Sequence, residues 1–169
     1  SQLQILLLVL IPLALCVKLV PIVRMVSKEG LNTYSLNGND TIAWTKKGYK
    51  KFEEAGYLLS VDEYESLKEQ CPHLRAIIRY ATNFSGKLMY RLATTYDLYS
   101  KSVIGFAPIS PKCGATAPVR EFSAKTQPDH IYILASLKTS FPSYSKYVMS
   151  GTPFFVWSKE YNGDFTDKL

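Results

Sequence analysis

Histidine and cysteine are scarce in this chain, which has two histidines and three cysteines among 169 residues. Neither an HExxH pair nor a CxxC pair occurs, so the patterns that typically hold zinc or carry thiol redox chemistry are missing. The sequence also lacks a GxSxG elbow, a phosphate-binding loop and a glycine-rich nucleotide turn. We therefore expect no cofactor, no metal and no catalytic residues, and we predict that the chain is not an enzyme.

A few residues could still take part in catalysis. Asp129-His130 could supply two members of a hydrolase triad. Ser143 and Lys146 match the first element of Ser-Lys acylating enzymes. The companion motifs are missing in both cases, so a membrane-tethered hydrolase using His130 or Ser143 is only a minor alternative.

The longest apolar stretch lies at the start of the sequence. From Leu3 to Val26 the only non-apolar side chains are Gln4, Lys18 and Arg24. A helix of this length would measure about 36 Å, enough to cross a hydrocarbon core of roughly 30 Å. We predict a single transmembrane helix over residues 1–27. A cleavable secretory signal and a helix buried in a larger assembly are the alternatives.

The composition of this segment suits a helix that packs against other helices. Pro12 and Pro21 would each kink it, and no aromatic residue precedes Tyr34 to mark the membrane interface. Lys18 and Arg24 are expected to position the helix, with Lys18 reaching the interface or a partner. The basic residues at and after its second half favour a C-terminal domain on the cytosolic, matrix or stromal side.

The charge balance is basic, with 20 Lys and Arg against 14 Asp and Glu, a net charge of +6. A basic balance suits anionic surroundings such as phospholipid headgroups. Without the two cations of the apolar segment, 18 basic residues face 14 acidic ones. No nucleic-acid recognition motif accompanies them. We expect contact with anionic phospholipid and none with nucleic acid.

The middle of the chain carries several helix start signals. Residues 28–44 are polar and are predicted to be a linker, which leaves residues 45–101 for a helical module. Helical patterns follow Thr45 and the capping box at Ser60, and Pro72 suits the first turn of a further helix. One more helix is expected at the end of the module.

Basic residues recur at one-turn spacing in the second half of this module. They are Arg75, Arg79, Lys87 and Arg91. Pairing with the acidic residues of the preceding segment is the simpler interpretation. On helices they would also form a stripe, and contact of this stripe with lipid headgroups or a partner is the sharper hypothesis.

Residues 102–169 are rich in proline and aromatic residues and are predicted to be extended, with a few short strands that contact a partner. The expected strands are the apolar runs Val103–Phe106, Ile131–Leu137 and Phe154–Trp157. Phe154, Phe155 and Trp157 are the expected docking anchors, because aromatic side chains provide large contact areas. The predicted fold class is therefore mainly α: a transmembrane helix, a helical module and an extended C-terminal region.

We expect a non-catalytic accessory subunit of a multi-subunit membrane complex, since no catalytic constellation is present. An energy-transducing complex of the mitochondrial inner membrane, such as one of the respiratory chain, is the specific hypothesis. Its partners would be the other subunits. The residues point to no known family.

A secretory-pathway, membrane-anchored binding or adhesion glycoprotein is the main alternative. Asn39-Asp40-Thr41 and Asn83-Phe84-Ser85 are formal glycosylation sequons. Cys71 and Cys113 could form a disulfide outside the cytosol. The sequence leaves open both the glycosylation and the bond.

Overall fold

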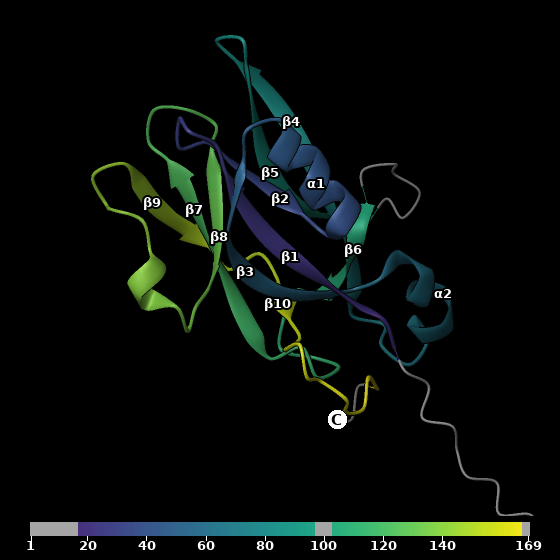
Figure 1. Ribbon diagram of the computed structural model, residues 1–169. Coiled ribbons are helices and arrows are strands. Elements are labelled where there is room, and N and C mark those ends of the chain that lie inside the picture. Colours follow the sequence, from purple (N-terminus) through teal and green to yellow (C-terminus); the bar gives the residue numbers. More distant parts are fainter. Residues whose placement is uncertain (1–16, 97–102, 167–169) are drawn as a thin grey trace, which may run out of the picture.

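The computed structural model describes residues 17–96 and 103–166, which fold mainly as β-strands (Figure 1). The strands are β1 (Leu19–Val26), β2 (Asn32–Ser35), β3 (Lys50–Leu59), β4 (Leu74–Phe84), β5 (Lys87–Thr95), β6 (Val103–Pro108), β7 (Ala117–Ala124), β8 (His130–Leu134), β9 (Tyr147–Gly151) and β10 (Phe155–Val156). The helical elements of this part of the chain are α1 (Gly38–Lys46), α2 (Tyr64–Leu67) and the 3-10 turns η1 (Val61–Glu63) and η2 (Lys138–Ser140). The predicted mainly α fold class is therefore wrong.

The described strands build two antiparallel sheets. The larger sheet has the strand order β2-β1-β3-β6-β4-β5, and its edge strands β2 and β5 contact each other, so it is strongly curved. In the smaller sheet β8 pairs along β7, while β10 and β9 pair with the first and last residues of β7. Tyr57 and Trp157 exchange two backbone hydrogen bonds of 3.1 Å, which join β3 to the chain just after β10.

Strand β1 occupies the second half of the predicted transmembrane helix. It pairs with both β2 and β3, and its side chains from Ile22 to Met25 are all buried. A strand buried on both faces has a continuous apolar run, which periodicity alone cannot tell from a buried helix. Valine and isoleucine make up half of this segment and favour the strand.

Among residues 17–96 and 103–166, no helix is both long and apolar enough to cross a membrane. Residues 1–16 of the predicted transmembrane helix lie outside the described residues. The single-pass membrane localisation, in the mitochondrial inner membrane or elsewhere, and the respiratory-chain assignment depend on a helix over residues 1–27. Strand β1 contradicts them.

The helical module predicted over residues 45–101 is also wrong. Most of its described part forms β3, β4 and β5, and only η1 and α2 follow the capping signal at Ser60. Leu74, Ile77 and Ile78 match a helical spacing, but they belong to β4, which pairs with β6 and β5. The three strands expected after residue 102 correspond to β6, β8 and β10.

The segment predicted as a linker contains helix α1. Asn37 Oδ1 accepts a 2.9 Å hydrogen bond from Asp40 N, and the Thr41 hydroxyl donates to the Asn37 carbonyl oxygen at 2.9 Å. The first contact satisfies a backbone N–H that the first turn of a helix leaves open. Figure 1 shows α1 against the larger sheet, with the tip of the β4–β5 hairpin extending above it.

Two buried tyrosines connect the sheets. Tyr34 on β2 and Tyr132 on β8 meet edge to face, with ring centroids 5.2 Å apart. The Tyr34 hydroxyl donates to the His130 carbonyl oxygen (3.0 Å) and accepts from Tyr132 N (2.9 Å). The Tyr132 hydroxyl accepts from Leu92 N on β5 (3.0 Å), and its single proton is shared between the Leu92 carbonyl oxygen (2.7 Å) and the Glu121 carboxylate. We call these five residues the tyrosine clasp.

Burial is the largest cause that raises the pKa of the Tyr34 and Tyr132 phenols. Both hydroxyls therefore stay protonated at neutral pH. A protonated phenol can donate and accept at once, which is what each hydroxyl of the clasp does.

Substituting Tyr132→Phe removes the hydroxyl and leaves the amide and carbonyl of Leu92 without their clasp partner. We expect the free energy of unfolding to fall by about 1–3 kcal/mol, because buried polar groups lose their hydrogen bonds. Urea denaturation followed by circular dichroism measures the loss. Tyr144→Phe is the control, since that side chain is 66% exposed, and it should change stability by less than about 0.5 kcal/mol.

Candidate functional site

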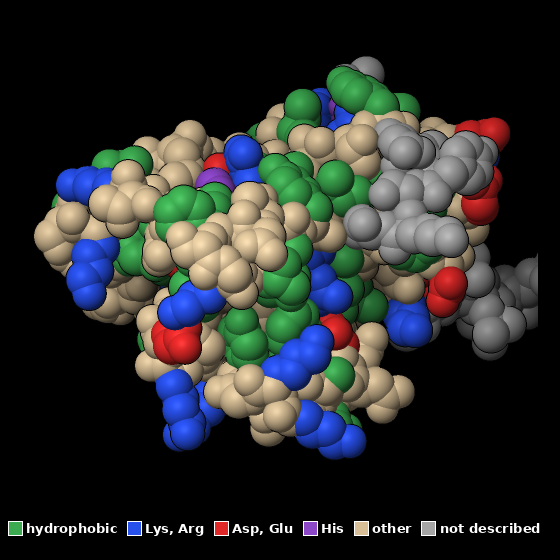
Figure 2. All heavy atoms as spheres, turned by 90° about the horizontal axis from the view of Figure 1, so that it is seen from above, with side chains coloured by type: hydrophobic (Ala, Val, Ile, Leu, Met, Phe, Trp, Pro, Cys, Tyr) green, Lys and Arg blue, Asp and Glu red, His purple; other side chains and the backbone are tan. Residues whose placement is uncertain are grey.

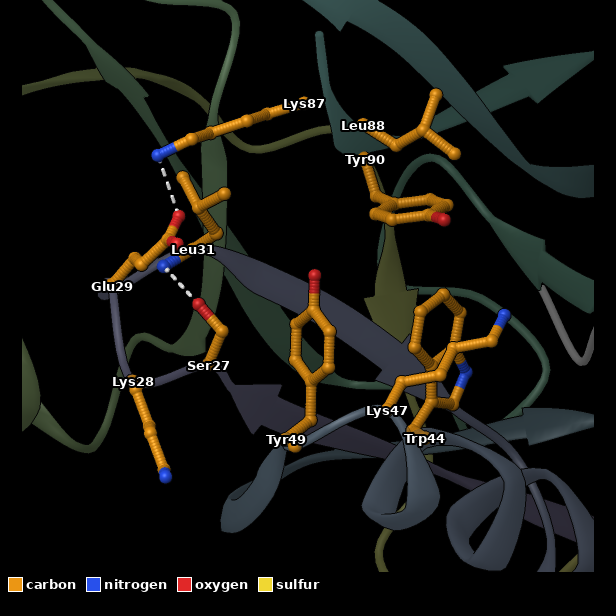
Figure 3. A pocket seen from close by; sticks show the side chains of 11 residues that line it. Ser27, Lys28, Glu29, Leu31, Trp44, Lys47, Tyr49, Lys87, Leu88 and Tyr90 are labelled. Atoms are coloured by element: carbon orange, nitrogen blue, oxygen red, sulfur yellow. Dashed lines mark hydrogen bonds and ion pairs between the residues drawn. The ribbon is translucent and has the colours of Figure 1, made fainter.

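The candidate site is a pocket of about 570 Å³ between the β1–β2 turn, the C-terminal end of α1 and strand β5 (Figure 3). Its lining residues are Ser27, Lys28, Glu29, Leu31, Trp44, Lys47, Gly48, Tyr49, Lys87, Leu88 and Tyr90. They come from segments far apart in the sequence, which only the folded chain brings together.

Three aromatic rings form one side of the pocket. The Trp44 ring lies 5.1 Å from Tyr49 and 5.1 Å from Tyr90, and both contacts are edge to face. Trp44 is buried against Val23 and Met25 of β1, which fixes the ring from below. In Figure 3 the Tyr49 hydroxyl points into the open space between Leu31 and Tyr90.

A helix-ending motif places two of these rings side by side. Gly48 N donates to the Thr45 carbonyl oxygen (3.0 Å), and Tyr49 N donates to the Trp44 carbonyl oxygen (3.1 Å). This is the Schellman pattern, in which a left-handed residue follows the helix and an apolar contact spans its end. Gly48 has a φ of 89° and supplies that residue, and Trp44 with Tyr49 supplies the contact.

Burial raises the pKa of both tyrosines that face the pocket, Tyr49 and Tyr90. For Tyr49 the nearby Tyr90, Asp129 and Glu29 raise it further, while Arg79 lowers that of Tyr90. Both phenols therefore stay neutral at pH 7 and can donate hydrogen bonds.

The charged residues of the pocket are mostly basic. Lys87 Nζ lies 2.6 Å from the carboxylate of Glu29, so the only acidic lining residue is already paired. Lys47 Nζ lies 4.7 Å from the centroid of the Trp44 ring, a cation–π contact. Lys28 is an exposed third cation on the β1–β2 turn. The pocket therefore favours an anion.

Figure 2 looks down on the end of the molecule where the β4–β5 hairpin points toward the viewer. Hydrophobic side chains form a band across the middle of this face, with Lys and Arg side chains mainly to its left and below it and some Asp and Glu side chains on the same face. The apolar character of the pocket therefore has a counterpart on the wider surface.

The four basic residues predicted to form a helical stripe lie on β4 and β5. Arg79 pairs with Asp40 at 2.9 Å, and Arg91 lies 3.6 Å from Glu121. Lys87 pairs with Glu29, as described above. Arg75 Nη1 donates to the Leu74 carbonyl oxygen at 3.0 Å, and its guanidinium lies over the Tyr96 ring. These contacts are within the chain, and only Lys87 lines the pocket.

The two cations predicted to position a membrane helix have different surroundings. Lys18 is exposed just before β1, and its backbone N donates to the Glu63 carboxylate at 3.1 Å. Arg24 is buried within β1, lies 3.5 Å from the Glu53 carboxylate on β3 and stacks on the Phe52 ring. The role of Arg24 here is to pair neighbouring strands.

The three predicted docking anchors pack inside the domain. Phe154 and Trp157 are buried in the main core, and Phe155 is partly buried against it. Trp157 Nε1 donates to the Cys113 carbonyl oxygen at 2.9 Å. Phe154 and Trp157 are therefore not exposed for docking to a partner, because the chain covers them itself.

The residues considered for catalysis do not form a triad. His130 Nδ1 lies 3.3 Å from the Ser123 hydroxyl and 3.9 Å from the Glu121 carboxylate, so one ring nitrogen faces both groups. A triad needs the nucleophile and the orienting acid on opposite ring nitrogens. Ser143 lies next to Ser145, with 2.8 Å between their hydroxyl oxygens. In the described ranges, no group of three or more potential ligands could hold a metal.

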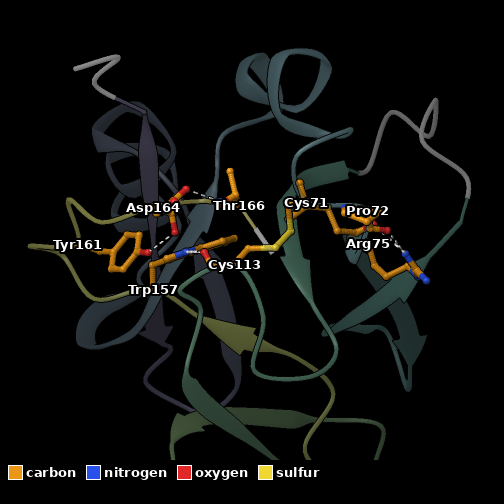
Figure 4. The surroundings of a disulfide bond; sticks show 9 residues. Cys71, Pro72, Arg75, Cys113, Trp157, Tyr161, Asp164 and Thr166 are labelled. Carbon is orange, nitrogen blue, oxygen red and sulfur yellow. Dashed lines mark hydrogen bonds between the residues drawn. A yellow bond between two sulfur atoms is a disulfide. The ribbon is translucent and has the colours of Figure 1, made fainter. Parts of the chain in front are cut away.

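A disulfide joins Cys71, before β4, to Cys113, between β6 and β7 (Figure 4). Their Cα atoms are 6.0 Å apart and 42 positions separate them in the sequence. In the chain-entropy model a loop of this size contributes roughly 4 kcal/mol by restricting the unfolded chain. Both residues are buried, next to the Trp157 indole that bonds Cys113.

Comparison with protein-family models, with curated proteins and with solved structures gave no match for this chain.

Trp44, Tyr49 and Tyr90 are not among the site residues predicted from the sequence. One signal could have revealed the first two, because a glycine after a helical segment, flanked by aromatic residues, predicts the Schellman contact. Tyr90 has no such signal, since it comes from a strand that only the tertiary fold brings to the pocket.

The Schellman motif makes a specific prediction for Gly48. Substituting Gly48→Ala should lower the free energy of unfolding by about 1–2 kcal/mol, because alanine is strained at positive φ. An added Cβ at this position meets nothing within 4 Å, so the cost is purely conformational. Thermal and urea denaturation measure it.

Gly38→Ala is the matched control. Gly38 begins α1, has no positive φ and also has open space around its Cβ position. This variant should keep or raise stability, because alanine is the better helix former. Equal losses in the two variants would contradict the assigned role of Gly48.

Proposed function

We propose that this chain is a binding protein that holds a small organic anion with an apolar body in the Trp44–Tyr90 pocket. The observation that carries the proposal is the pairing of an aromatic wall with three lysines and one carboxylate that is already neutralised. A volume of about 570 Å³ falls within the range of small-molecule sites.

Each part of the pocket matches one part of such a ligand. Leu31, Leu88 and the Trp44 ring offer apolar contact to its body. The neutral hydroxyls of Tyr49 and Tyr90 can donate hydrogen bonds. Lys28 and Lys47 supply the positive potential that favours its charge, because Lys87 is paired with Glu29.

The disulfide supports a site of action in an oxidising compartment, such as the lumen of the secretory pathway or the cell exterior. Disulfides form and persist there and are rare in reducing compartments. The two sequons agree with the same compartment, since N-linked glycans are added in the secretory pathway.

The other expectations about function stay predictions. They are an accessory subunit with other subunits and anionic phospholipid as partners, no contact with nucleic acid, and no catalysis. No contact among the described residues favours the accessory subunit over a binding protein.

Calorimetric titration with 1-naphthaleneacetate and with its uncharged amide tests the proposed ligand class. The two probes share an apolar body and differ in charge. We expect the acid to bind at least about 10-fold more tightly than the amide, which corresponds to about 1.4 kcal/mol. The acid should also bind more weakly as salt is raised.

The double variant Lys28→Gln/Lys47→Gln should bring the affinity for the acid close to that for the amide. Lys138→Gln is the control, because Lys138 is exposed on η2 and does not line the pocket. Equal binding of acid and amide by the unaltered chain, or no binding of the acid at millimolar concentration, would refute the proposed ligand class.

A further inference from the structure

The second sequon lies at the tip of the β4–β5 hairpin. Phe84 and Lys87 form the last strand pair, so Ser85 and Gly86 are the two loop residues. Their φ angles are 52° and 79°, and positive φ at both positions is typical of a type I′ hairpin turn. Asn83, Phe84 and Ser85 are all exposed.

The side chain of Asn83 leaves its amide nitrogen accessible. Its Oδ1 accepts a 3.2 Å hydrogen bond from Gly86 N, which orients the side chain at the turn. Within the described residues no hydrogen-bond partner is recorded for Nδ2. The nitrogen that would carry a sugar therefore faces solvent at an exposed tip.

In the first sequon, Asn39-Asp40-Thr41, the second and third residues form contacts within the fold. Asn39 lies in the first turn of α1, and the Thr41 hydroxyl that completes the sequon lies 2.8 Å from the Ser35 hydroxyl. It also donates to the Asn37 carbonyl oxygen, as described above. Asp40, the middle residue, is held by Arg79. Acceptor sites belong to surface loops, so the hairpin tip suits a glycan better than this helix end.

We propose that Asn83 carries an N-linked glycan and that Asn39 does not. The donor is an oligosaccharide linked to a lipid diphosphate. The bond between Nδ2 and C1 of the first sugar forms, the bond between C1 and the diphosphate oxygen breaks, and Nδ2 loses one proton. The lipid diphosphate leaves. This inference rests on the oxidising secretory compartment of the proposed function.

The glycan would stand beside the pocket. Asn83 is directly opposite Leu88, and Ala81 is directly opposite Tyr90, in the β4–β5 pairing. Residues directly opposite each other project to the same face of a sheet, and so do alternate residues along a strand. Asn83 therefore shares its face with Leu88 and Tyr90, which line the pocket. The glycan would cover Leu88, which is 49% exposed.

Secretion of the full chain from insect cells, behind a cleavable leader, tests the proposal. Treatment with peptide-N-glycosidase should increase electrophoretic mobility and convert Asn83 to Asp, which peptide mass spectrometry locates. Asn83→Gln should abolish the mobility change. Ser85→Gly should abolish it as well, and glycine suits the positive φ at that position. Asn39→Gln should leave the mobility change intact.

The same secreted material separates the two proposals. Glycosidase-resistant protein with a Cys71–Cys113 disulfide would overturn the glycan and leave the compartment standing. Glycosylated protein with free thiols at both cysteines would remove the disulfide as support for an oxidising compartment and leave the glycan standing. A mobility change that persists in Asn83→Gln and disappears in Asn39→Gln would place the glycan on Asn39 instead of Asn83. That result would refute the inference.

Discussion

The edge-to-face contact of Tyr34 and Tyr132 is the interaction on which the rest of this structure depends. Tyr34 belongs to one edge strand of the larger sheet, and its hydroxyl binds the backbone of β8 at two points. The Tyr132 hydroxyl forms hydrogen bonds with the backbone of Leu92 on β5, the opposite edge strand. Among the described residues no further strand pairs with the outer side of β2 or β5, and the clasp links both of these edge strands to β8 of the smaller sheet.

The tyrosine clasp also helps to fix the shape of the pocket. Leu92 and Tyr90 are on the same face of β5, so the strand that the clasp holds also carries one of the three aromatic rings of the pocket. The other two rings come from the end of α1, where the turn at Gly48 sets Tyr49 against Trp44. A site built between elements that are separately fixed can bind with little loss of conformational entropy.

The sequence could predict the local features and not the long-range ones. The short C-terminal strands are bounded by proline or turn residues, and they could be recognised. Leu74, Ile77 and Ile78 fit the spacing of a helix as well as a strand, and the pairing of β4 with β6 and β5 decides between them. The turn at Gly48 was not predicted, because a helix was expected to follow Thr45, and the contribution of Tyr90 depends on a strand that only the tertiary fold brings to the pocket.

Amide hydrogen exchange at Leu92 tests the central claim most directly. The buried Leu92 N–H points to the Tyr132 hydroxyl from the side of β5 on which no described strand pairs. If the clasp holds the sheets together, this amide should exchange only through global unfolding, as slowly as the buried amide of Tyr132. Exchange of Leu92 at the rate of an open edge strand, with Tyr132 still protected, would contradict the account.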